Sequence, residues 1–485
     1  MIRNGRQDFL SNLILLLLLN LLIKPVYILG IDAEVQARVG TEIYGSYFAL
    51  LNISFLLNIL CDLGINNYTT REVAKAGIIQ QNTFAGTAQL RLFLGLIYLI
   101  IALICGFILG YRGFEIEMLL ILAINQVFAS FILFFRSNLT GLHLFRKDSL
   151  ISVLDRLLLI IGLGYLLLRS SDTPFDIRWL VYGQTAAYLI TALSAYWMLK
   201  PYGAGLKYKL NFSEALLTLK ASYPYALLIF MMMVYNRTDG VMLERMLDDG
   251  AAQAGIYARA YRFFEALNMV AYLFAVLLLP MFSKALHEKT SIRPLVKTGF
   301  QLLLFGSCIV ACLGFFYSTE IMEFRYDDLT TLTAPVLQIL LLGFVALSIS
   351  YVTGTLLTAS GDLRSLNRIA LLSVLLNVVL NFLMIPVWGA YGSAVATLIT
   401  QWFAVFAQVY SIAYRFRPKP DYSLLIRSSL FVSLLATSGY LSTIIDAGIG
   451  FKIGILLGSG IVFGILTRLL NISTLITMLK ERLEA

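Results

Sequence analysis

Long apolar runs separated by short polar breaks fill almost the whole chain. A helix needs about 20 apolar residues to cross a bilayer, and several of these runs reach that length. The pattern predicts about fourteen membrane helices, over residues 9–30, 43–64, 88–110, 117–136, 150–168, 178–199, 222–246, 255–280, 298–317, 334–358, 369–387, 392–414, 424–445 and 451–470. The sequence therefore predicts an all-α polytopic membrane protein.

Composition supports this class. The chain has 485 residues, of which 59% are hydrophobic and 13% charged, and its mean hydropathy is +0.82. An outer-membrane barrel would show short alternating strands instead of continuous apolar runs. The first run continues to about Gly30 with no clear small-residue cleavage site, so we expect an uncleaved first helix.

Little in the sequence points to chemistry on a cofactor or metal. The four cysteines lie in apolar runs, and the two histidines fall in separate expected loops, so we expect neither disulfides nor a metal site. A Gly-rich phosphate loop ending in Lys-Ser/Thr is absent from the sequence, which argues against ATP hydrolysis. We therefore expect no cofactor, no catalytic residues and no enzymatic activity.

The net charge of +9 comes from alternate loops. One set is rich in Lys and Arg, whereas the other holds little beyond Arg38, Arg112, Arg169 and Arg325. By the positive-inside rule, the first set and both termini face the cytoplasm. This placement explains the basic charge without a nucleic-acid partner.

An internal repeat divides the chain. Tyr182–Thr191 resembles Tyr391–Thr400 at an offset of 209, and Gly45-x-Tyr47 resembles Gly255-x-Tyr257 at an offset of 210. A third match, Leu139-Thr140 with Leu357-Thr358, has an offset of 218. Six helices per repeat give both halves the same orientation, so an axis along the membrane normal relates them.

This repeat predicts two six-helix lobes related by a pseudo-two-fold axis along the membrane normal, plus two C-terminal helices. We expect an N-terminal lobe over residues 1–199, a cytoplasmic linker over 200–220 and a C-terminal lobe over 221–414. Residues 415–485 then form the two additional helices and a cytoplasmic tail. We expect the substrate path to lie between these two lobes, as in transporters built from such repeats.

The candidate site lies in the helices flanking a polar turn at Asp248–Gly250. Each unpaired charge at the bilayer centre costs roughly 2.5–3.5 kcal/mol, so such residues usually face a protein interior or a watery cavity. Arg259 and Arg262 share one helix face, which Glu265 continues, whereas Arg237 and Asp239 point in different directions.

Two interpretations of these charges remain open. They could form interhelical ion pairs or snorkel to the membrane surface. Alternatively, the arginines could line a cavity for an anionic substrate, with Lys24 at a similar depth in the first lobe. The cations Lys24, Arg237, Arg259 and Arg262 lack four matching acids, which favours the anionic substrate. Three further arginines, nearer the cytoplasmic helix ends, are explained by snorkelling: Arg91, Arg136 and Arg156.

Three segments resemble the Wzx-type oligosaccharide flippases of the MOP exporter superfamily, which includes MATE transporters. They are Arg237–Leu243, Gly255–Tyr257 and Ile385–Thr397, and the likeness extends over essentially the whole chain. In the third segment, Pro386 and Gly389 suit a tight turn between two helices. The resemblance implies a MATE/MOP-like fold in the bacterial inner membrane.

It also implies a function and a site. The substrate would be an undecaprenyl-diphosphate-linked oligosaccharide, moved from the cytoplasmic to the periplasmic leaflet for surface polysaccharide such as O-antigen. Related flippases use cations on the first and eighth helices, which correspond to Lys24 and to Arg259 or Arg262. Arg237 joins them as a binding candidate, and Asp239 and Glu265 are coupling or ion-pair candidates. The implied partners are this lipid-linked oligosaccharide, membrane lipids, and a polysaccharide polymerase with its chain-length regulator.

Two alternative functions remain open. A multidrug or ion antiporter of the same superfamily would share the fold but favour carboxylates in its cavity. A membrane O-antigen polymerase or glycosyltransferase resembles chains with a large extracytoplasmic loop or outer acidic residues. Asp327 and Asp328 are the only such acids here, in a short loop.

Overall fold

The computed structural model describes residues 18–169, 175–205, 219, 230–231, 233–235, 237–326, 329–417 and 421–470. Several predictions fall partly or wholly outside these residues: the start of the first span, most of the linker, most of the span at 222–236, Asp327 with Asp328, and the C-terminal tail. The described residues fall into two compact units. The first is Met1–Arg262 with Asn381–Ala390, and the second is Phe263–Leu380 with Tyr391–Ala485.

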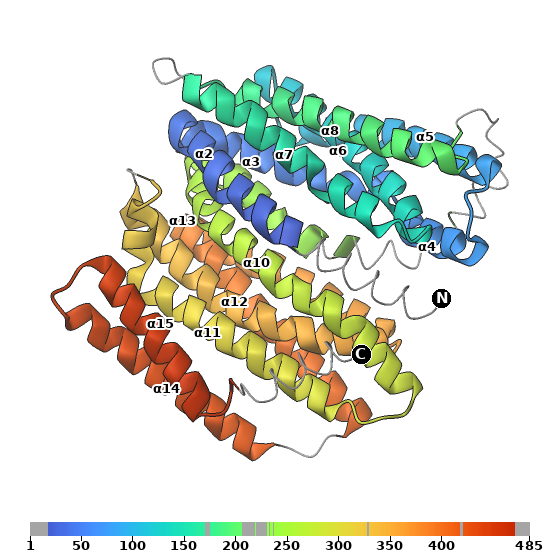
Figure 1. Ribbon diagram of the computed structural model, residues 1–485. Coiled ribbons are helices and arrows are strands. Elements are labelled where there is room, and N and C mark those ends of the chain that lie inside the picture. Colours follow the sequence, from blue (N-terminus) through green and yellow to red (C-terminus); the bar gives the residue numbers. More distant parts are fainter. Residues whose placement is uncertain are drawn as a thin grey trace. The chain divides into compact units, whose positions relative to one another are not determined.

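Every element of the described chain is helical (Figure 1). The first unit contains η1 (Val26–Asp32), α2 (Ala33–Val39), α3 (Thr41–Leu57), η2 (Asn58–Cys61), α4 (Ile65–Ala76), α5 (Gln81–Ile108), α6 (Phe114–Gly141), α7 (Phe145–Arg169), α8 (Ile177–Leu199) and η3 (Lys200–Tyr202). The second contains most of α10 (Gly250–His287), α11 (Arg293–Glu323), α12 (Thr330–Ala359), most of α13 (Leu363–Phe416), α14 (Tyr422–Ile444) and α15 (Ile449–Leu466).

Ten described helices are long and apolar enough to cross a membrane. Large apolar side chains also remain exposed along them, such as Leu168 and Phe406, as expected for a surface that faces lipid. The chain is thus a multi-pass membrane protein. The expected number of about fourteen spans stays a prediction, because part of the chain lies outside the described residues.

In the first unit, α6 is the central helix and packs against α3, α4, α5, α7 and α8. Polar side chains hold it in place. Asn125 donates to the Val181 carbonyl on α8 at 3.3 Å, and Asn58 donates to Gln126 at 3.1 Å. Hydrogen bonds between membrane helices fix their rotation, because in hydrocarbon the alternative is an unsatisfied polar group.

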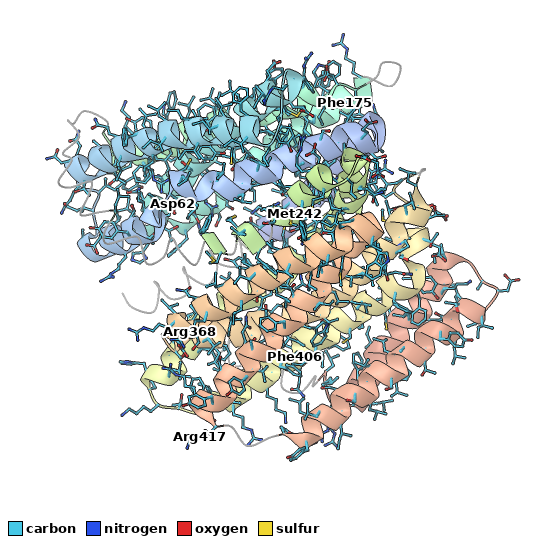
Figure 2. All side chains as sticks on the ribbon, turned by 180° about the vertical axis from the view of Figure 1, so that it is seen from behind. Asp62, Phe175, Met242, Arg368, Phe406 and Arg417 are labelled. Atoms are coloured by element: carbon cyan, nitrogen blue, oxygen red, sulfur yellow. The ribbon has the colours of Figure 1, made fainter. Side chains whose placement is uncertain are left out.

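In the second unit, α11 packs against α12, α14 and α15, around an apolar core that includes Tyr317 and Phe431. Arg368 and Arg417 lie at the same end of this unit (Figure 2), as the alternation of Lys- and Arg-rich loops predicts. The helix pair predicted at 369–387 and 392–414 is present as α13, which breaks at Gly389 with φ 55°. A side chain there would be strained, because positive φ is costly for residues other than glycine.

The repeat-related glycines meet at one helix crossing. A methyl group at Gly45 of α3 would lie 1.7 Å from the Ala251 carbonyl oxygen of α10. A methyl group at Gly255 would lie 2.0 Å from the Thr41 carbonyl oxygen. The offset of 210 between residues 41 and 251 is also the offset between residues 45 and 255. The contact is therefore reciprocal, as expected when a two-fold axis relates the two repeats.

Candidate functional site

The two candidate arginines of α10 lie inside the first unit. Arg259 is 1% exposed and Arg262 is 7% exposed. They are three residues apart, so they share one face of the helix. A guanidinium group stays charged at any relevant pH, which makes this face a buried positive region.

Asp32 is the acidic partner of Arg262. Arg262 Nε lies 2.7 Å from Asp32 Oδ2, and Arg262 Nη2 donates to the Tyr44 hydroxyl at 2.7 Å. Tyr44 in turn donates to Asp32 Oδ2 at 2.8 Å, and Gln36 donates to the same oxygen at 3.3 Å. Asp32 is only 2% exposed, so three elements surround this carboxylate: α2, α3 and α10.

The sequence analysis missed Asp32 because it placed residues 31–42 in a loop. The described chain is helical there instead, through η1 and α2, and turns at Gly40 with φ 83°. Val35 and Val39, four residues apart and both buried, are the signal in the sequence that indicated a helix. Arg262 therefore has an acid within reach, and the argument from missing acids does not hold for it.

Asp239 forms a second buried polar group. Its Oδ2 accepts from Tyr257 at 2.9 Å and its Oδ1 accepts from Asn381 at 2.7 Å. Arg237 points elsewhere, as expected from its spacing: its guanidinium lies 4.4 Å from the centre of the Phe55 ring and 3.4 Å from Asn52 Oδ1. The carboxylates of Asp32 and Asp239, on different segments, thus each accept a hydrogen bond from a tyrosine hydroxyl.

Aromatic rings surround these polar groups. Tyr44 and Tyr47 pack edge to face at 5.2 Å, Tyr257 stacks on Tyr261 at 5.7 Å, and Phe48 lies 6.2 Å from Tyr261. Rings that exclude water lower the local dielectric, so the charges between them interact more strongly than at a surface. The same shielding makes it costly to remove one member of an ion pair.

The remaining two candidates are Lys24 and Glu265. Lys24 is half-buried, and its charged neighbours are Arg156, Asp155 and Arg136. Arg156 also lies over the Tyr27 ring at 4.8 Å. Glu265 is half-buried on α10 and belongs to the second unit. Of the six candidates, only Arg237, Asp239, Arg259 and Arg262 lie close to one another in sequence and within one unit.

Arg91 corrects the snorkelling interpretation. Its side chain is fully buried and forms an ion pair with Asp62. It also donates to Asn66 Oδ1 at 2.6 Å and to the Ser130 carbonyl at 2.8 Å. Snorkelling requires a charged head in water, so that interpretation is wrong for Arg91. Asp62, just before α4, is the acid that the sequence analysis missed.

Comparisons with known proteins agree with this architecture. The family profile described as "Polysaccharide biosynthesis protein" matches residues 9–286, which is more than half of the chain. A second profile, described as "MatE", matches residues 224–383. An uncharacterized membrane protein of Methanocaldococcus jannaschii is 25% identical over 397 residues, which cover 77% of this chain and 90% of that protein.

Two solved structures share the fold. The lipid II flippase MurJ in an inward closed conformation has a TM-score of 0.71 at 17% identity, covering 96% of this chain and 97% of its own. An inward-facing multidrug resistance MATE family transporter of the MOP superfamily has a TM-score of 0.59 at 14% identity, covering 84% and 98%. At these identities the likeness concerns the fold. Taken with the match over residues 9–286, it shows that the chain belongs to the polysaccharide biosynthesis protein family and has the MOP-superfamily fold.

Proposed function

We propose that this protein is a flippase that moves an undecaprenyl-diphosphate-linked oligosaccharide from the cytoplasmic to the periplasmic leaflet. The observation that carries the proposal is the buried arginine face of α10, where Arg259 and Arg262 are buried on a candidate membrane helix. Arginine binds phosphate oxygens through two parallel hydrogen bonds. A diphosphate is the anionic part of such a substrate, so these two residues are its proposed binding groups.

Asp32 has a defined role in this proposal. Without substrate, its carboxylate holds Arg262 at 2.7 Å and keeps the guanidinium oriented. An incoming diphosphate then competes with Asp32 for Arg262, and Tyr44 and Gln36 continue to satisfy the released carboxylate. Exchange of one anionic partner for another avoids leaving a buried charge unpaired, which would cost several kcal/mol.

The other candidates have secondary roles. Lys24 and Arg237 are proposed as further cationic contacts along the path, and Asp239 and Glu265 as candidates for ion coupling. The proposed location is the bacterial inner membrane with both termini in the cytoplasm, as the Lys and Arg bias predicts. A polysaccharide polymerase and its chain-length regulator are the proposed protein partners.

The test is complementation of a strain that lacks its own flippase. Arg259→Gln and Arg262→Gln each keep much of the side-chain bulk but remove the charge, so surface polysaccharide should fall strongly in both. Arg364→Gln is the matched control, because Arg364 is exposed on α13 and lies outside the site. The amount of each variant in the membrane is measured alongside.

A double variant distinguishes a substrate-binding role of Arg262 from a purely structural one. If Arg262 serves only as the partner of Asp32, Asp32→Asn combined with Arg262→Gln removes both charges and restores transport. If Arg262 binds the diphosphate, the double variant reaches normal membrane levels but stays inactive. Full surface polysaccharide from Arg259→Gln, Arg262→Gln and the double variant would refute the proposed binding role.

The match of residues 224–383 to the MatE profile favours one second candidate, a multidrug antiporter. Buried carboxylates such as Asp32 and Asp239 would then bind a cationic drug or a proton. Drug susceptibility of the complemented strain distinguishes the two: a flippase leaves it unchanged, whereas an antiporter lowers it.

A further inference from the structure

The turn that ends α5 is held in place by its own backbone. Gly110 adopts φ 89° and its N–H donates to the Phe107 carbonyl at 3.2 Å, while the N–H of Tyr111 donates to the Gly106 carbonyl at 3.0 Å. These two hydrogen bonds form a Schellman motif, which needs a left-handed residue at the position of Gly110. The motif fixes the backbone of Tyr111, whose side chain is fully buried.

Two residues of the predicted C-terminal lobe enclose this turn. Tyr111 donates to Glu244 Oε2 at 2.7 Å, and the Arg245 guanidinium lies 3.7 Å from the centre of the Tyr111 ring. Arg245 also donates to the Leu109 carbonyl at 3.0 Å and forms an ion pair with Glu244. The last carbonyls of a helix lack partners within it and lie at the negative end of its dipole, so a guanidinium group is favourable there. We call Tyr111, Glu244 and Arg245 the latch.

The distribution of Lys and Arg assigns the latch to the extracytoplasmic side. The turn between α5 and α6 is one of the loops poor in these residues, and residues 244–245 closely precede the polar turn at Asp248–Gly250. The two parts of the latch are 133 positions apart. Because residues 1–199 and 221–414 are predicted to form separate lobes, the latch connects one predicted lobe to the other.

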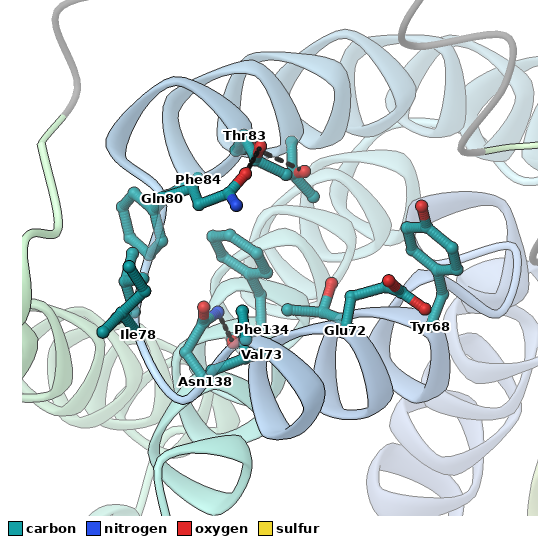
Figure 3. Close-up of a pocket in the computed structure, with 13 residues that line it drawn as sticks. Tyr68, Glu72, Val73, Ile78, Gln80, Thr83, Phe84, Phe134 and Asn138 are labelled. Carbon is teal, nitrogen blue, oxygen red and sulfur yellow. Dashed lines mark hydrogen bonds between the residues drawn. The ribbon is translucent and has the colours of Figure 1, made fainter.

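The opposite end of the α5–α6 pair is hollow instead. A cavity of about 360 Å³ lies beside the start of α5 and the end of α6 (Figure 3). All of its lining residues fall between Tyr68 and Asn138, so the N-terminal lobe alone bounds it. The contacts of Glu244 and Arg245 are therefore made at the extracytoplasmic end of this helix pair.

We propose that the latch holds the extracytoplasmic end closed and opens in each transport cycle. Transporters built from repeats work largely by rocking one lobe against the other around a central site. Substrate then leaves only after Tyr111 separates from Glu244 and Arg245 leaves the end of α5. Because the Arg245 side chain is 28% exposed, water competes for its charge, and the latch can open reversibly. The inference rests on the proposed function in one respect, that the protein transports a substrate.

The first experiment measures how often this end opens. Asn52→Cys provides a reporter on α3, because Asn52 is 1% exposed and its Oδ1 accepts from Arg237 Nη1 at 3.4 Å. The full-length protein, with its four native cysteines changed to alanine, is labelled in spheroplasts with a membrane-impermeant methanethiosulfonate. We expect Arg245→Gln to raise the labelling rate about tenfold and Tyr111→Phe about threefold, since each shifts the population toward the open state.

Arg112→Gln is the matched control for the loss of charge. Arg112 is the neighbouring arginine of the same turn, and its described hydrogen bonds go to the Phe107 and Tyr111 carbonyls of its own lobe. It should leave the labelling rate unchanged, and equal rates in Arg245→Gln and Arg112→Gln would overturn the inference. Tyr111→Phe keeps the ring and the Schellman turn, so it preserves the test if Arg245→Gln folds poorly.

The second experiment holds the latch closed. Tyr111→Cys and Glu244→Cys are combined and joined by a short, reducible bis-methanethiosulfonate crosslinker. Transport should stop on crosslinking and return when a reductant cleaves the link. Phe107→Cys with Arg112→Cys is the control pair within one lobe, and it should transport whether crosslinked or not. Undiminished transport by the crosslinked Tyr111–Glu244 pair would refute the latch.

These outcomes are distinguishable from the failure of the proposed function, because labelling reports the movement whatever the substrate is. If Arg259→Gln and Arg262→Gln transport normally while the crosslink stops transport, the latch is supported and the diphosphate site is refuted. If both of these variants fail to transport while Arg245→Gln leaves labelling unchanged, the diphosphate site is supported and the latch is refuted.

Discussion

The two units differ in what they bury. Among the described residues, every buried charged side chain belongs to the first unit: Asp32, Arg91, Asp148, Asp239, Glu244, Arg259 and Arg262. The buried polar side chains of the second unit are uncharged, such as Ser348, Thr353 and Asn377. Buried charges in a membrane protein are expensive and usually functional, so the first unit is where a charged substrate or ion is expected to act.

Two ion pairs of the second unit lie at helix ends. Lys297 pairs with Asp421 at 2.8 Å, and Arg415 pairs with Asp362 at 3.4 Å. The first pair joins α11 to the start of α14, and the second joins the two ends of α13. An exposed pair contributes about 0–1 kcal/mol, whereas breaking a buried pair costs about 3–5 kcal/mol. The units should therefore respond very differently to the loss of one charge.

The largest expected effect is the loss of Asp62 in the first unit. Asp62→Asn leaves Arg91 fully buried without its acid, and we expect destabilisation of about 3–5 kcal/mol. Lys297→Gln in the second unit should cost about 1 kcal/mol or less, because Lys297 is 38% exposed. Thermal unfolding of the full-length protein in detergent measures both. Equal losses would show that burial of charge does not distinguish the two units.

The next effect concerns the reciprocal crossing of α3 and α10. Gly45→Ala and Gly255→Ala each place a methyl group against a backbone carbonyl oxygen, at 1.7 and 2.0 Å. The backbones must separate, and we expect a loss of about 1–3 kcal/mol or more for each. Gly306→Ala on α11 is the control, because nothing lies within 4 Å of its added methyl group. It should be neutral or slightly stabilising, since alanine favours helix more than glycine does.

Crosslinking tests the two-fold relation at the same crossing. Paired cysteines at Gly45 and Ala251 should form a disulfide as readily as paired cysteines at Thr41 and Gly255, because the repeats exchange these two contacts. A disulfide at only one pair would show that the contact is not reciprocal.

Much of the fold could be predicted from the sequence. Apolar length gave the helices, because it is read along one chain, whereas the two-lobe arrangement inferred from the repeat offsets stays a prediction. Helix ends were less accurate: the span predicted at 88–110 is α5, Gln81–Ile108. Its first turns are polar, and hydropathy alone cannot place an end that leaves the membrane.

The candidate site was harder to predict, because ion pairs join residues far apart in sequence. Arg262 was identified as a buried cation, but its partner Asp32 is 230 positions away, in a segment interpreted as a loop. Arg91 was assigned to the membrane surface because its acid, Asp62, lies 29 positions away in the turn before α4. Periodicity shows which face a residue occupies, but it does not show which acid faces it.

A smaller effect is expected from an uncharged pair in the second unit. The Thr353 hydroxyl donates to Gln408 Oε1 between α12 and α13. Thr353→Val keeps the shape but leaves that oxygen without this donor, at a cost of about 1 kcal/mol. Thr437→Val is the control, because the exposed Thr437 hydroxyl bonds to Ser433 of its own helix. A loss as large as that of Asp62→Asn would contradict the contrast between the units.

The smallest effect is a pH dependence at Asp421, which caps the start of α14. The hydrogen bond from Lys297 and the backbone N–H of Leu424 lower the pKa of the Asp421 carboxyl. Its folded pKa then lies below the unfolded value of about 3.9, so the folded protein binds fewer protons here. The resulting stability is present above about pH 4 and is lost as the pH falls through the folded pKa.

Asp421→Asn keeps a capping oxygen but does not titrate. The melting temperature of the wild type should therefore exceed that of Asp421→Asn slightly at pH 6, and the difference should shrink toward pH 3 and in high salt. A difference that stays constant with pH would show that the carboxylate charge contributes nothing. The exposed Lys297–Asp421 pair would then contribute nothing to stability, which would sharpen the contrast with the buried pairs of the first unit.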